Sequence, residues 1–321
     1  MSTDSAGSGR PAGPPDLTGL VPAAGLGFGP QIAGSLGTGG RGPRLLSGGG
    51  RKATVISTVS TLIVLAALAA VFWLAPGSAE FRHAFFSPQN MWQAFIGNPK
   101  RGYYSVGEAI WLNIKMFLIA EVLILILSLV IALIRQSVSP VLFPLRVLAM
   151  IYVDFFRGVP LLLVVYAVGL GVPALRLPVI STQSSTVYGI AVLTLSYSAY
   201  VSEVYRAGLN SVHQSQVAAA RSLGLSQATA LRYVILPQAF RNVIPPLLND
   251  FISLQKDTAL VGVLGAIEAL QAAGIYASSV FNYSSYTVAA ILFLVLTIPL
   301  ARFTDRVIDR DRRRRLAGAV R

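Results

Sequence analysis

Long apolar stretches dominate the chain after residue 52. Three of them contain no Asp, Glu, Lys or Arg: residues 53–79, 177–202 and 269–301. A helix needs about 20 mostly apolar residues to cross the hydrocarbon core of a bilayer. The pattern therefore predicts an all-α, polytopic membrane protein with six crossings, at residues 53–75, 109–134, 147–170, 187–206, 243–265 and 286–305.

The composition agrees with this class and excludes several others. Only 12% of residues are charged, about half of what a soluble domain carries. There is no cysteine and there are only two distant histidines, so we expect no disulfide, no metal site and no catalytic thiolate. None of the four lysines follows a glycine, as a phosphate-binding loop requires. If ATP is used, we therefore expect another chain to bind it.

The two ends of the chain differ from the apolar part. Residues 1–50 hold 15 of the 29 glycines and 6 of the 18 prolines, which predicts a disordered tail. Residues 51–107 hold the first crossing and an outer segment rich in aromatic residues, typical of a membrane boundary or a docking surface. Residues 307–321 form a basic tail.

Lysine and arginine positions predict the orientation. With both termini in the cytoplasm, 19 of these residues lie in cytoplasmic segments and 4 lie outside, as the positive-inside rule favours. The net charge of +13 is then explained by topology and by attraction to membrane lipid, and not by nucleic acid.

The loop between the fourth and fifth crossings, residues 209–242, is unusually long. We call it the elbow. Residues 213–223 have a helical composition, and Gly224 is suited to a left-handed cap. Ser226 can cap a second helix, 227–235, which Pro237 would kink or end. The alternative is an Ala-rich helix that lies on the membrane surface.

The third predicted crossing carries charge at membrane depth. Asp154 and Arg157 share one helical face and can pair, and Gly158 with Pro160 interrupts the helix. Broken helices at mid-depth often line a substrate site. Two interpretations stay open: Arg157 or the backbone at Gly158 meets the substrate or steadies a gate, or the pair only braces an interface.

Two further charged sets lie near crossings four and five. Lys256 and Asp257 are adjacent and must point to different faces. They could attract the carboxylate and the amino group of an amino acid, or serve as braces between helices. Glu203 and Arg206 are three residues apart, which predicts a structural ion pair beside the elbow.

Four sequence blocks resemble the permease subunits of ABC importers. The elbow reads Ala218-Ala219-Ala220, three residues, Gly224, nine residues and then Val234-Ile235-Leu236-Pro237. It is similar to the family signature, with Ala218 in place of a Glu and Val234 in place of an Ile. The other blocks, which resemble the polar amino acid branch (histidine, glutamine and glutamate), are residues 152–161, 199–208 and 236–260.

The resemblance implies a fold and a mechanism. The fold is a five-helix type I permease core, residues 108–306, plus one extra N-terminal transmembrane helix, in a bacterial inner membrane. Two permeases pair, two ATPase subunits bind ATP and Mg²⁺, and an extracytoplasmic binding protein delivers an amino acid such as glutamate or glutamine. The coupling contact with the ATPase would involve Ala218, Ala219, Ala220, Gly224, Leu236 and Pro237. The main alternative is an ion- or proton-coupled secondary amino acid carrier, and an integral-membrane enzyme is disfavoured by the missing catalytic residues.

Overall fold

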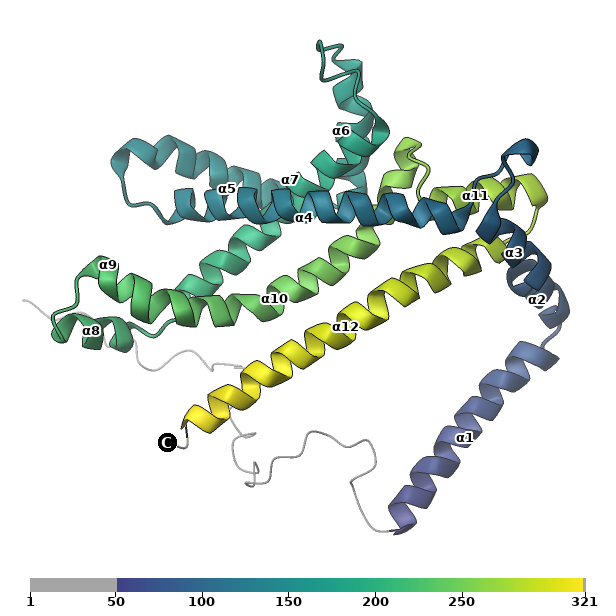
Figure 1. The fold of residues 1–321 in the computed structure, drawn as a ribbon, viewed down its shortest axis with the longest axis horizontal. Helices are drawn as coiled ribbons and strands as arrows, with labels where there is room; N and C mark the ends of the chain where they lie inside the picture. Colours follow the sequence, from purple (N-terminus) through teal and green to yellow (C-terminus); the bar gives the residue numbers. More distant parts are fainter. Residues whose placement is uncertain (1–50, 320–321) are drawn as a thin grey trace, which may run out of the picture. The chain divides into compact units, whose positions relative to one another are not determined.

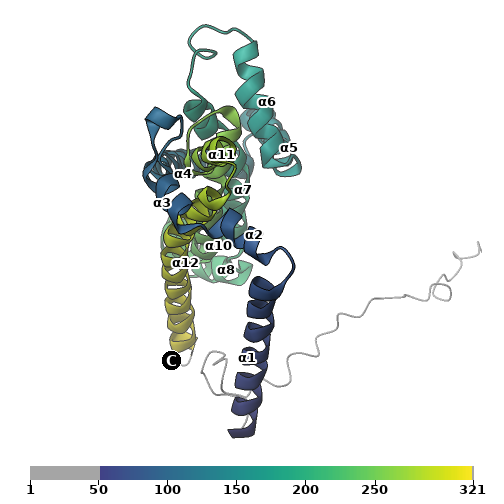
Figure 2. The ribbon, with the colours of Figure 1, turned by 90° about the vertical axis from the view of Figure 1, so that its right-hand side faces the viewer.

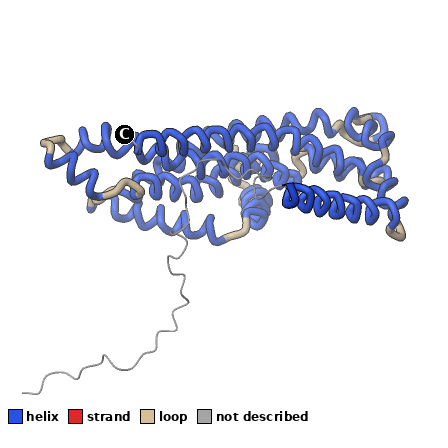
Figure 3. The backbone as a smooth tube through the Cα atoms, turned by 90° about the horizontal axis from the view of Figure 1, so that it is seen from below, coloured by secondary structure: helices blue, strands red, loops and turns tan. Residues whose placement is uncertain are grey.

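The computed structural model of the chain describes residues 51–319. The tail predicted to be disordered, residues 1–50, lies outside the described residues. The chain divides into two compact units, Met1–Leu68 and Ala69–Arg321. The described residues form helices and the loops that join them, with no strand among them (Figure 3).

Helix α1, Arg51–Leu74, corresponds to the first predicted crossing. From Thr54 to Leu74 it is long and apolar enough to span a membrane, and no residue of its most apolar window is buried. A helix that is apolar on every side needs a membrane or a protein core around it. The helix agrees with the crossing predicted at residues 53–75.

The second unit holds the other helices (Figure 1). In chain order they are α2 (Ser78–Phe86), α3 (Pro88–Ile96), α4 (Val106–Gln136), α5 (Phe143–Gly158), α6 (Leu161–Ala174), α7 (Ser185–Asn210), α8 (Gln214–Ser222), α9 (Gln227–Ala230), α10 (Leu236–Asp257), α11 (Ala269–Val280) and α12 (Ser284–Ala319). Among the described residues, α1, α4, α7 and α12 can each cross a membrane alone, and two bent pairs raise the number of crossings to as many as six. The first, second, fourth and sixth predicted crossings are thus single helices. The third is bent within its length, and the fifth ends at the bend that precedes α11.

Helix α7 lies at the centre of the second unit. Its most apolar window is 61% buried, against 33% for α4 and 17% for α12. Helices α4, α5, α6 and α10 all pack against it (Figure 2). The shared core contains Met116, Phe117 and Ile124 of α4, Leu193, Tyr197 and Val201 of α7, and Leu254 of α10. Residues carried by α7 are therefore held in place from several sides.

The break between α5 and α6 lies where the sequence predicts it. Pro160 cannot donate a backbone hydrogen bond, and it disfavours helical backbone at the residue before it. Val159 is accordingly extended, with φ −96° and ψ 131°. The helix pair bends by 111°. Residues 147–170 are therefore no straight crossing: the chain turns sharply at the predicted interruption.

The second bent pair includes a helix, α11, that lies outside the six predicted crossings. Helix α10 continues into a 3₁₀ turn, η4 (Thr258–Leu264), and Gly265 then adopts the left-handed region at φ 86°. Helix α11 follows, between the fifth and sixth predicted crossings, and the pair bends by 48°. Glu268, which is fully buried, caps α11 by accepting hydrogen bonds from the backbone N–H groups of Leu270 and Gln271 at 2.8 and 2.7 Å.

The segment that follows α1 is fixed to the start of α12. The Asn282 side chain donates to the His83 carbonyl oxygen at 2.9 Å, and the Thr287 hydroxyl donates to the Phe85 carbonyl oxygen at 2.6 Å. The Ser284 hydroxyl accepts a hydrogen bond from the Ser87 backbone N–H at 3.1 Å. Helices α2 and α3 are therefore part of the packed second unit. Trp92 and Phe95 of α3 remain exposed, as residues at a membrane boundary would be.

Candidate functional site

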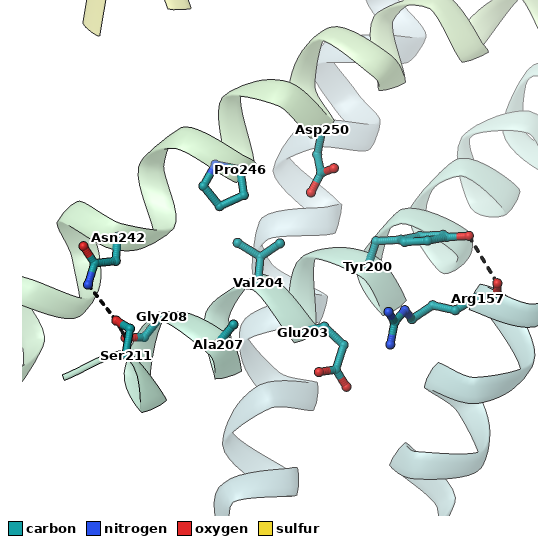
Figure 4. Close-up of a pocket in the computed structure, with 10 residues that line it drawn as sticks. All are labelled: Arg157, Tyr200, Glu203, Val204, Ala207, Gly208, Ser211, Asn242, Pro246 and Asp250. Atoms are coloured by element: carbon teal, nitrogen blue, oxygen red, sulfur yellow. Dashed lines mark hydrogen bonds between the residues drawn. The ribbon is translucent and has the colours of Figure 1, made fainter. Parts of the chain in front are cut away.

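Two adjoining pockets lie between α7, α10 and the break that ends α5. The wide pocket has a volume of about 570 Å³ and is lined by Arg157, Tyr200, Glu203, Val204, Ala207, Gly208, Ser211, Asn242, Pro246 and Asp250 (Figure 4). The narrow pocket has a volume of about 260 Å³ and is lined by Phe156, Val159, Leu161, Ser196, Tyr197, Tyr200, Asp250, Ser253 and Asp257. Tyr200 and Asp250 line both, so we call the pair of pockets the passage.

Close packing of α7 on α10 forms the end of the passage nearest the elbow. A Cβ atom at Gly208 would collide with the Val243 side chain and lie 3.2 Å from the Ala239 carbonyl oxygen. The Asn242 side chain donates a hydrogen bond to the Ser211 hydroxyl at 2.6 Å, and Figure 4 shows this contact. The glycine therefore lets the two helices approach each other where they enter the elbow.

Arg157 lines the wide pocket, as a substrate-contact candidate should. Its guanidinium lies 5.9 Å from the centroid of the Tyr200 ring, and the Tyr200 hydroxyl donates to its carbonyl oxygen at 3.4 Å. The expected ion pair with Asp154 is not formed in the described chain. The reason is that Arg157 turns toward α7, whereas Asp154 lines neither pocket and is exposed.

The adjacent residues Lys256 and Asp257 do point to different faces. Asp257 lines the narrow pocket, and its Oδ2 accepts a hydrogen bond from the Tyr197 hydroxyl at 2.6 Å. Lys256 is exposed and lines neither pocket. Gly158 is also outside both linings, with open space around it. The structure thus brings Arg157 and Asp257 to the passage but not Asp154, Gly158 or Lys256.

Several lining residues were not among the sequence candidates. Asp250 supplies a carboxyl group to both pockets, and its Oδ2 is buried without a hydrogen-bond partner. The Ser196 hydroxyl is in the same state, and this residue is 2% exposed. A carboxylate within an apolar span is costly, so Asp250 could have been singled out from sequence. Ser196, Tyr197 and Tyr200 carry no such signal.

Glu203 forms a three-residue ion cluster on the wall of the wide pocket. Its Oε2 accepts hydrogen bonds from the guanidinium of Arg206 at 2.6 and 2.9 Å, which is the pair that the spacing predicts. Its Oε1 accepts a hydrogen bond from Arg135, at the end of α4. Glu203 thus pairs with two guanidinium groups, which leaves the cluster with a net charge of +1, and the cluster ties α4 to α7.

The elbow contains the two short helices that its sequence predicts. Gly224 follows α8 with φ 81°, in the left-handed region. The Ser226 hydroxyl then caps α9 by accepting a hydrogen bond from the Thr229 backbone N–H at 3.2 Å. Beyond α9 the outcome differs from the expected break at Pro237. A π-helical turn, η3 (Leu231–Ile235), absorbs the proline, so that α9 runs on through η3 into α10.

Within residues 51–319, no group of three or more His, Cys, Asp or Glu side chains is placed to hold a metal ion. The passage therefore offers charged and hydroxyl side chains for binding a ligand directly. Apart from Arg157 and the doubly paired Glu203, the charged side chains on its lining are Asp250 and Asp257.

Comparisons with known proteins agree with this architecture. Residues 141–314 match the family model for the binding-protein-dependent transport system inner membrane component. The probable amino-acid permease protein YxeN of Bacillus subtilis (strain 168) is 38% identical over 192 residues, which cover 60% of this chain and 84% of YxeN. The probable glutamine ABC transporter permease protein GlnM of the same organism is 39% identical, over 49% of this chain and 72% of GlnM.

The fold is also that of a solved transporter. The crystal structure of an amino acid ABC transporter with histidines aligns with a TM-score of 0.59 and 30% sequence identity, covering 64% of this chain and 93% of the solved one. This match shows the type I permease fold. The chain therefore belongs to the family of binding-protein-dependent transport system inner membrane components, and it is an inner-membrane permease subunit of an ABC importer for polar amino acids.

Proposed function

We propose that this chain forms the pathway for a polar L-amino acid, and that a separate ATPase drives it through the elbow. In this proposal the ATPase subunits bind ATP and Mg²⁺ and hydrolyse the nucleotide. A second permease completes the transporter, an extracytoplasmic binding protein delivers the amino acid, and both termini lie in the cytoplasm. The continuity of the elbow with α10 is the single observation that carries the proposal.

Because the elbow continues into α10, it is physically connected to the wall of the passage. The helical rod made of α9, η3 and α10 runs without a break from Gln227 to Asp257. Asn242, Pro246, Asp250 and Asp257 all belong to this rod and line the passage. Most of the opposite wall belongs to α7. A displacement of the elbow would therefore move one wall of the passage against the other.

The surface of the elbow is suited to close contact with another protein. Ala218 and Ala219 are exposed, and Leu223 beside the bend is 82% exposed. Small side chains allow a partner's backbone to come near, and an exposed leucine offers apolar area to bury. Because Ala218 replaces the Glu of the family signature, the contact has no carboxylate at this position. We propose that packing, rather than a charged pair here, holds the ATPase.

Gly224→Arg tests the coupling. A non-glycine residue in left-handed backbone costs about 1–2 kcal/mol, which favours a different bend, and the long side chain would stand in the contact surface. We expect ATP-dependent amino acid uptake to fall at least about tenfold, since a shift of that energy changes an equilibrium by this factor, with normal abundance in the membrane. Uptake by vesicles prepared from cells with the complete transporter measures it.

Gly102→Arg is the matched control, because Gly102 also has a positive φ, 83°, with open space around it, but lies outside the elbow. Its uptake should match that of the unmodified chain. Normal uptake by Gly224→Arg would refute the coupling. Uptake that follows an imposed ion or proton gradient, without ATP, would instead favour the secondary carrier.

A further inference from the structure

The charges on the passage lining are unequal. Glu203 carries two guanidinium partners, so it has no free charge to offer a ligand. Among the described residues that line the two pockets, Arg157 is the one basic side chain, and Asp250 and Asp257 are the remaining acids. Among the lining side chains that form no ion pair, two are therefore negative and one is positive.

Unmet hydrogen-bonding capacity lies beside these acids. Asp250 Oδ2 is buried and accepts no hydrogen bond. The Ser196 hydroxyl, 98% buried, has no hydrogen-bond partner although it lines the narrow pocket together with Asp250 and Asp257. Buried polar groups without a partner are costly, and an incoming ligand can satisfy them. These two groups call for a hydrogen-bond donor in the narrow pocket.

The three charges are arranged along the passage. Arg157 lies at the wide pocket with its guanidinium near the Tyr200 ring, and Asp250 points from α10 across the pocket toward α7 (Figure 4). Asp257 lies seven residues further along the same rod, in the narrow pocket. The wide pocket, at about 570 Å³, falls in the usual size range of sites for small molecules.

We propose that the passage selects an amino acid with a cationic side chain, of the arginine, lysine or ornithine type. Such a ligand carries two positive groups and one carboxylate, so its charges complement the two acids and the one arginine of the lining. Arg157 would bind the α-carboxylate, and Asp250 and Asp257 would bind the two cationic groups, with Ser196 as an additional partner. This inference rests on the proposed function and narrows its substrate.

Acidic substrates do not complement the charges of the lining. Glutamate has two carboxylates and one ammonium group, so one carboxylate would face Asp250 or Asp257 without a basic side chain on the lining to balance it. Like charges at close range repel each other. The glutamate that the sequence suggests is therefore disfavoured. Glutamine, which is uncharged overall, should bind more weakly than arginine.

Direct binding tests the selection apart from any binding protein. The complex of this permease with its ATPase, purified and placed in lipid nanodiscs, is titrated with radiolabelled L-arginine, L-glutamine and L-glutamate up to about 10 mM. We expect affinity to decrease in that order. Asp250→Asn should weaken arginine binding by about tenfold or more, as expected for the loss of a hydrogen bond between charged groups, and change glutamine binding less than about threefold. Asp305→Asn, on the exposed part of α12, is the matched control and should bind like the unmodified chain.

The outcomes separate this inference from the proposed function. Stronger binding of glutamate than arginine, equal losses for arginine and glutamine in Asp250→Asn, or no binding at all by the unmodified complex would each overturn the inference. None of these would affect the coupling by ATP, which is measured by uptake. Absence of ATP-driven amino acid uptake would overturn both. If Asp250→Asn is poorly produced, Asp257→Asn replaces it with the same expected pattern.

Discussion

The two helix breaks of the second unit are built in opposite ways. At the α5–α6 break, Gly158 and Pro160 are exposed, and nothing lies within 4 Å of a Cβ atom placed on Gly158. At the α10–α11 break, Glu268 is completely buried and hydrogen-bonded on both oxygens. The first break comes from local steric rules, and the second is stabilised by contacts with a distant helix.

The distant helix is α4. Its Asn113, 1% exposed, donates hydrogen bonds to Glu268 Oε2 and to the Thr258 hydroxyl, each at 3.0 Å. The Asn113 side-chain oxygen Oδ1 accepts a hydrogen bond from the Ala269 backbone N–H at 3.0 Å. One asparagine thus joins both sides of the bend to α4. The two breaks also differ in their relation to the passage. Val159 and Leu161 of the first break line the narrow pocket, whereas Gly265 and Glu268 of the second break line neither pocket.

Removing the carboxyl group of Glu268 should have the largest effect on stability. Glu268→Ala would remove the acceptor of one of the two hydrogen bonds that the buried Asn113 amide donates, and the side-chain acceptor of the partly buried backbone N–H groups of Leu270 and Gln271. An unsatisfied buried donor costs about 1–3 kcal/mol. We expect the free energy of unfolding to fall by about 3 kcal/mol or more, measured by thermal unfolding of the purified chain in detergent. Glu268→Gln keeps one acceptor oxygen and should lose less. If Glu268→Ala unfolds at the same temperature as the unmodified chain, the role assigned to this cap is wrong.

A methyl group added at each break should give a smaller and unequal effect. A Cβ atom at Gly262 would collide with Glu268 Oε1 and lie 3.1 Å from Gln271 Cβ. Overpacking of this kind costs about 1–3 kcal/mol, so Gly262→Ala should be destabilised by that amount. Gly158→Ala meets open space and should unfold like the unmodified chain. An equal loss of unfolding free energy in Gly262→Ala and Gly158→Ala would contradict the difference between the two breaks.

The difference between the breaks also explains what the sequence could predict. The α5–α6 break, the left-handed Gly224, the Ser226 cap and the Glu203–Arg206 pair depend on residues at most four positions apart. All four were predicted from sequence and are present. Helix α11 was missed because its cap is a glutamate, not one of the usual capping residues, and that glutamate is held by Asn113, more than 150 positions away.

The residues of the passage, too, were predictable from sequence only where the signal is local. Charged residues in apolar spans attract attention in a sequence, and two of the five candidates, Arg157 and Asp257, line it. Whether the others face the lining or the exterior is decided by helix packing. Neither Arg135, which joins Glu203 from α4, nor Ser196, which looks like any serine of an apolar helix, can be assigned without the fold. The continuation of α9 into α10 through Pro237 depends on a π-helical turn that has no clear sequence signal.

The central claim is that α10 moves against α7 during transport. The most direct test is to link the elbow end of α10 covalently to the end of α7 and to measure uptake. The chain has no cysteine, so Ser211→Cys with Asn242→Cys places one thiol on each side of an existing 2.6 Å contact. The two thiols can be joined by oxidation or by a short bifunctional thiol reagent. If α10 must move against α7, ATP-dependent uptake should stop when the thiols are joined as a disulfide and recover on reduction, while each single variant transports throughout. Undiminished uptake by the fully joined protein would contradict the account.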